Sequence, residues 1–143
     1  MKTHDIIEMY DAQALHITSH QWILELEFIK DEHLFFEDLV KSFTLQLIDS
    51  KSYEEHSEII KAINASEKHN DLLLKAIKGH DKNLKSMVEG KLKPNEELAY
   101  KMEHKKFMEE LNAYLKAYKS LKMRLFTLMK GVFKKEKQKR LLA

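Results

Sequence analysis

The side chains best suited to chemistry in this 143-residue sequence are histidines. His16 and His20 stand four residues apart in "HITSH", so a helix would place both imidazoles on one face. His80 and His104 lie farther along the chain, each next to a carboxylate residue in sequence. Three or four imidazoles from different helices are a ligand set for zinc or another divalent metal. His20, His80 and His104, with His16 as a fourth ligand, are therefore the candidate metal ligands.

The elements that must position these histidines are helices. One proline and three glycines are far fewer than turns and strands would need, and 34% of the residues are charged. Three stripes of mostly apolar residues recur at alternating spacings of three and four, the pattern of helices packed on helices. The stripes run from Leu15 through Trp22 and Ile29, from His56 to Met87, and from Tyr100 to Val132. The chain is predicted to be all-α.

Two breaks divide the stripes. Ser52 and Glu55 have the spacing of a helix-capping box, and Gly90 followed by Pro94 marks the end of one helix and the start of another. The prediction is a single domain, residues 1–143, with helices over about 12–49, 52–89 and 95–137. Short connections favour an antiparallel up-down-up bundle with coiled-coil-like seams, with four helices if one breaks near Gly79 or Ser19.

Antiparallel pairing also predicts which residues share a height. His33 is expected beside Ser66, His69 and Asn70, across from Tyr114 and Tyr118. Hydroxyl and amide groups can satisfy both ring nitrogens, so His33 is interpreted as a core histidine in a polar layer, with a ligand role as the alternative. His80 is expected near residues 21 and 104. The alternative to a metal site there is a set of unrelated, partly exposed histidines.

Two stretches carry a family resemblance: "HQWILELEFIKDEHLFF" near the N-terminus and "EHKKFMEELNAYLKAYKSLKMRLFTLMK" near the C-terminus. They resemble a functionally uncharacterised family of short helical-bundle proteins common in Bacteroidetes. The resemblance covers most of residues 16–130 and rests on packing motifs. It implies a helical bundle and supplies no catalytic residues.

Several enzymatic sites are excluded by their required residues. A ferritin-like di-iron site needs Glu-x-x-His pairs, and none occurs in the sequence. Cysteine is absent, which rules out thiolate ligands, disulfides and cysteine nucleophiles. Neither a glycine-rich phosphate loop nor an oriented Ser-His-Asp set is found. No enzymatic activity and no cofactor are therefore expected, apart from the divalent metal of the alternative.

Charge is unevenly distributed. Residues 130–140 carry six basic side chains and one acid, so the C-terminal segment 130–143 is a basic tail. Anionic lipid or nucleic acid could contact it, whereas lysines at a helix C-terminus also complement the helix dipole without a ligand. The residues of such a contact are Lys134, Lys135, Lys137, Lys139 and Arg140. Six acids cluster within residues 25–38 and are interpreted as a solvated face.

The remaining expectations concern location and partners. No stretch of 18 uncharged apolar residues and no signal-peptide core is found, so a cytoplasmic protein without a transmembrane segment is expected. Phe28, Phe35 and Phe36 widen the apolar surface of the first helix beyond what two neighbours would cover. The favoured function is a non-enzymatic protein-interaction or scaffold bundle that self-associates, with metal binding or basic-tail binding as alternatives.

Overall fold

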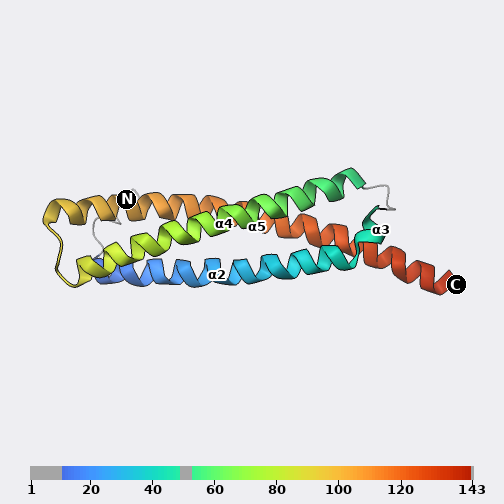
Figure 1. Ribbon diagram of the computed structural model, residues 1–143, viewed down its shortest axis with the longest axis horizontal. Helices are drawn as coiled ribbons and strands as arrows, with labels where there is room; N and C mark the ends of the chain where they lie inside the picture. Colours follow the sequence, from blue (N-terminus) through green and yellow to red (C-terminus); the bar gives the residue numbers. More distant parts are fainter. Residues whose placement is uncertain (1–10, 49–52, 143) are drawn as a thin grey trace.

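The computed structural model describes residues 11–48 and 53–142, and this part of the chain is helical apart from short connections and contains no strand. It forms α2 (Ala12–Ser42), α3 (Thr44–Ile48), α4 (Tyr53–Val88) and α5 (Pro94–Leu142). Three of these are long and lie alongside one another, and the five-residue α3 sits at one end (Figure 1). The predicted all-α class is confirmed.

The first predicted helix, over 12–49, is divided in the structure. Asp11 caps α2 by accepting a hydrogen bond from the Ala14 backbone N–H at 2.8 Å. The helix ends at Ser42, and Phe43 separates it from α3. Hydroxyls on both sides of Phe43 bond to the preceding turn: Ser42 Oγ to the Asp38 carbonyl, and Thr44 Oγ1 to the Val40 and Lys41 carbonyls. Such back-bonding bends helices, and it explains why the break falls here.

The breaks considered at Ser19 and Gly79 do not occur, because both residues lie inside continuous helices. Ser19 is fully buried and bonds the His16 carbonyl and the Asp81 carboxylate, which joins α2 to α4. Gly79 is flanked on α4 by the buried Ile77 and His80. Tertiary packing on both sides outweighs the roughly 1 kcal/mol that a mid-helix glycine costs.

The turn between α4 and α5 is a Schellman motif. Gly90 has a φ of +71°, the left-handed conformation that glycine adopts without a steric penalty. The Lys91 N–H bonds the Ser86 carbonyl at 3.1 Å, and the Gly90 N–H bonds the Met87 carbonyl at 3.0 Å. Pro94 then begins α5, as its spacing predicts. The predicted capping residue Ser52 lies outside the described residues.

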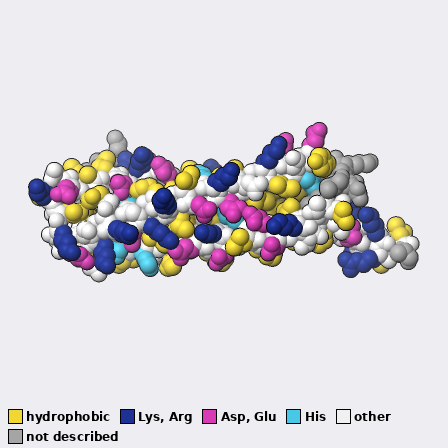
Figure 2. Space-filling view, in the orientation of Figure 1, with side chains coloured by type: hydrophobic (Ala, Val, Ile, Leu, Met, Phe, Trp, Pro, Cys, Tyr) yellow, Lys and Arg dark blue, Asp and Glu magenta, His cyan; other side chains and the backbone are white. Residues whose placement is uncertain are grey.

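Helix α5 is longer than the predicted range of 95–137. It continues to Leu142 and so includes most of the basic tail. The residues from 132 onward contain no glycine or proline and are mostly good helix formers, and Glu136 pairs with Lys139 one turn away. This end projects past the other helices, and lysine and arginine gather on it (Figures 1 and 2).

Contacts between the long helices show their relative directions. Residues later in α4 contact residues earlier in α2: Ser66 bonds His33, whereas Asp81 bonds Ser19. The α5 partners of α4 also run backwards, so α4 is antiparallel to both neighbours. Helices α2 and α5 are parallel, because Trp22 contacts His104 and Phe43 contacts Phe133.

The core lies along the predicted stripes. The helix backbones approach one another most closely between α2 and α4, less closely between α4 and α5, and least closely between α2 and α5, which meet through large side chains. Leu26, Ile59, Ile77 and Leu125 are fully buried where the three helices meet. Within the described ranges, no helix combines the length and apolar character needed to cross a lipid bilayer.

Candidate functional site

A polar layer crosses the middle of the bundle, where His33 was predicted to find partners. His33 Nε2 lies 2.9 Å from Ser66 Oγ. The Tyr114 hydroxyl donates to Asn70 Oδ1 at 3.1 Å and also approaches Ser66. Asn70 Nδ2 donates to the Leu26 carbonyl at 3.0 Å, which ties α4 to α2. The predicted layer is therefore confirmed and links all three long helices, although only one ring nitrogen of His33, Nε2, bonds a member of the layer.

The groups in this layer are neutral at physiological pH. Burial lowers the pKa of His33, and burial raises the pKa of Tyr114 to about 12. His33 is fully buried, so its imidazole lies out of reach of a substrate that general acid–base catalysis would act on. The layer instead resembles the polar contacts that fix helix register in bundles.

Beside the layer, Glu32 joins α2 to α5. Its carboxylate accepts a hydrogen bond from the Tyr118 hydroxyl at 2.7 Å and one from Lys122 Nζ at 3.3 Å. Burial, together with the bond to Glu32, raises the pKa of Tyr118. Interpreting every acid in residues 25–38 as solvated was therefore wrong for Glu32. The available signal was that Tyr118 and Lys122, one turn apart, share a height with this acid.

A hydrogen-bonded histidine pair lies toward the end of the bundle where α4 turns into α5. His80 Nδ1 is 2.7 Å from Glu103 Oε1, and His80 Nε2 is 2.9 Å from His104 Nδ1. Trp22 stacks on His104, with ring centroids 4.4 Å apart. Burial and the nearby His80 lower the pKa of His104 to about 4, and burial also lowers the pKa of His80. With both rings neutral, His104 donates to His80, and His80 donates to Glu103.

The other two metal candidates have different surroundings. His16 Nδ1 lies 2.9 Å from the Asp81 carboxylate, which also accepts from Ser19. His20 is exposed to solvent. The structure thus brings His80 and His104 together, places His16 in a separate group with Asp81, and leaves His20 on the surface.

This arrangement gives the metal hypothesis no geometric support. Across residues 11–48 and 53–142, no group of three or more His, Asp or Glu side chains is placed to hold a metal ion. Both nitrogens of His80 are already engaged in hydrogen bonds, so neither offers a free lone pair. The predicted site at His16, His20, His80 and His104 stays a prediction.

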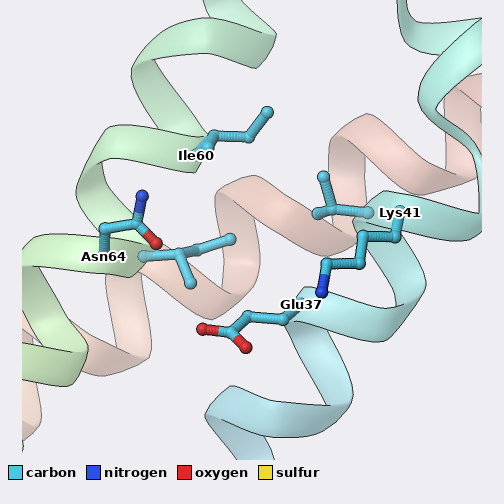
Figure 3. Close-up of a pocket in the computed structure, with 6 residues that line it drawn as sticks. Glu37, Lys41, Ile60 and Asn64 are labelled. Carbon is cyan, nitrogen blue, oxygen red and sulfur yellow. The ribbon is translucent and has the colours of Figure 1, made fainter.

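A cavity of about 270 Å³ opens between α2 and α4. In Figure 3, Glu37 and Lys41 reach toward it from α2, and Ile60 and Asn64 from α4. Val40 and Ile63 complete its lining. A hydrogen bond to Glu37 raises the pKa of Glu67, because the protonated Glu67 carboxyl group donates to the Glu37 carboxylate, so these two groups share a proton more readily than isolated ones. The lining residues include no hydroxyl, thiol or imidazole.

A wide groove of about 550 Å³ lies between α2 and α5. We call it the α2–α5 face and define it by Phe28, Leu115, Met123 and Phe126. Phe28 is 64% exposed, Met123 63% and Phe126 48%. The same stripe of α2 continues to the exposed Phe35.

This face was only partly predicted. The exposed surface of Phe28 and Phe35 agrees with the expected excess of aromatic area on the first helix, but Phe36 is buried against Tyr118 and Phe126. Met123 was missed because it falls outside the seam of α5. Its one signal is that it lies three residues before Phe126 and therefore on the same helix face.

No family model, curated protein or solved structure matches this chain. The resemblance to helical-bundle proteins of Bacteroidetes therefore stays a prediction, and the function of the chain is unknown.

Proposed function

We propose that this chain is a non-enzymatic interaction module that self-associates through the α2–α5 face. The observation that carries the proposal is the exposure of Phe28, Met123 and Phe126 around one groove. Large apolar side chains that gather on a surface mark sites of association more often than isolated ones do. Burying a phenylalanine removes apolar area worth about 1.5–3 kcal/mol from water.

The architecture of the proposed unit is an up-down-up bundle of the three long helices. Support comes from the antiparallel bonds that join α4 to each neighbour. The wider separation between α2 and α5 leaves a groove that two further helices can fill. A second copy supplies such helices, so that α2 and α5 of both copies surround the shared apolar side chains. The proposal keeps the cytoplasmic location expected from the sequence.

Light scattering coupled to size-exclusion chromatography tests the proposal. We expect the wild-type chain to form a dimer across micromolar concentrations. Phe28→Glu should raise the dimer dissociation constant about tenfold or more, since both copies lose an apolar contact and bury a charge.

Leu72→Glu is the matched control, because Leu72 is 70% exposed on α4 and does not line the groove. It should leave the dissociation constant unchanged, and circular dichroism should show full helix content for both variants. A wild-type chain that stays monomeric at every concentration would overturn the proposal.

A further inference from the structure

The α2–α5 face has one acidic rim and one basic rim. Glu25 and Glu32 border the groove on α2, and Lys119 and Lys122 border it on α5. Glu32 and Lys122 already bond each other within the chain. Glu25 and Lys119 take part in none of the ion pairs formed by the described residues. One unpaired charge of each sign is thus available to a partner.

Two-fold symmetry allows two ways of placing this face against itself. With the axis along the groove, α2 of one copy lies on α5 of its partner, and the two copies point in the same direction. With the axis across the groove, α2 lies on α2 and α5 lies on α5, and the copies point in opposite directions. The first arrangement opposes acid to base, and the second opposes like charges.

From these rims we infer that two copies pair about a two-fold axis along the groove, the acidic rim of each facing the basic rim of the other. This inference rests on the proposed self-association and describes how the two copies meet. Juxtaposed like charges oppose association, so the second arrangement is penalised along both of its contact lines. The apolar side chains of the α2–α5 face form the centre of the interface in either case.

One electrostatic force acts against this arrangement. The parallel pairing brings the basic ends of both α5 helices to the same end of the dimer, where they repel. These ends project beyond the other helices (Figures 1 and 2) and are exposed to solvent. Salt screens such charges over about 8 Å at physiological ionic strength, whereas charges in contact at the rims are screened much less. The rims therefore dominate the choice of axis.

Charge reversal distinguishes the two axes, because a single reversal weakens the dimer only where acid faces base. With acid opposed to base, Glu25→Lys and Lys119→Glu each replace an attraction with a repulsion on both contact lines. Each should raise the dimer dissociation constant roughly 3- to 30-fold, as expected for a few exposed ion pairs. Combining the two reversals in one chain restores the complementarity and should recover most of the affinity. Lys82→Glu, an exposed lysine on α4 away from the groove, is the control for net charge.

The outcomes separate this inference from the proposed function. Single reversals that tighten the dimer would place the axis across the groove and overturn the inference, while self-association itself would stand. Single variants without effect on a stable dimer would also overturn it, since acid would then not face base across the interface. A monomeric wild-type chain would overturn both. Single variants that dimerise more weakly, together with a double variant of recovered affinity, support the axis along the groove.

Discussion

His33 and His104 are both buried, yet their partners differ in kind. His33 bonds the Ser66 hydroxyl, whereas His104 bonds a second imidazole that is itself bonded to Glu103. In both cases burial holds the ring in its neutral form, because a charged imidazole loses more hydration than these partners return. The buried histidines thus act as polar connectors between helices, as hydroxyls and amides do elsewhere in the bundle.

A double-mutant cycle on His33 and Ser66 tests this role. His33→Leu should lower the free energy of unfolding by about 1–2 kcal/mol, because Ser66 loses a partner while the added apolar surface compensates in part. The double variant with Ser66→Ala should be less destabilised than the sum of the singles, with a coupling energy above about 0.5 kcal/mol. Urea unfolding at neutral pH measures all three. Additive effects would show that the 2.9 Å contact contributes little to stability.

The position of His33 was predictable, whereas for Glu32 the sequence indicated the height of its partners but not the direction of its side chain. A helical stripe and antiparallel pairing determine which residues share a height, and this sufficed for Ser66, Asn70 and Tyr114. Glu32 lies beside the stripe, where the direction of the side chain decides between solvent and a neighbour. Spacing alone carries no information on that direction. The same limit applies to His16, which pairs with Asp81 instead of joining the other histidines.

The ends of α2 and α4 differ in how clearly the sequence marks them. Gly90 announces the end of α4, because left-handed backbone strongly favours glycine. The break at Phe43 has no such marker, since Ser42 and Thr44 also occur inside helices. Their hydroxyls bend the chain only where the surrounding packing permits it. That packing depends on α4 and cannot be inferred from the local sequence.

Two glycine-to-alanine substitutions should have opposite effects. Gly90→Ala places a Cβ in the left-handed region and should lower the free energy of unfolding by about 1–2 kcal/mol. Gly79→Ala should raise it by about 0.5–1 kcal/mol, because a helix interior favours alanine and no atom lies within 4 Å of the added Cβ. Thermal unfolding followed by circular dichroism measures both. Equal signs for the two variants would contradict the assigned backbone conformations.

At the scale of the whole molecule, the buried histidines are distributed along the entire bundle. The four histidines that are at most 3% exposed stand at both ends and in the middle: His33, His56, His80 and His104. Burial lowers the pKa of each below the ordinary value of 6.5. The unfolded chain therefore binds protons at mildly acidic pH that the folded bundle does not bind. Acid should therefore weaken the packing of the three long helices along the whole bundle.

This linkage determines how the free energy of unfolding depends on pH. Above about pH 7 the four histidines are neutral in both states and contribute no pH dependence. As pH falls below 6.5, protons bind the unfolded chain first, so the free energy of unfolding decreases toward the folded-state pKa values. His104, with a pKa of about 4, accounts for a loss of about 3 kcal/mol over that interval.

Urea unfolding at a fixed, low protein concentration from pH 7.5 to pH 5 should show this decline, and His104→Gln should reduce its slope by about one proton. His20→Gln is the matched control, because this imidazole is exposed to water in the folded and unfolded chain alike. A slope that His104→Gln leaves unchanged would mean that the folded and the unfolded chain bind equal numbers of protons at His104, and burial would then not hold this ring in its neutral form.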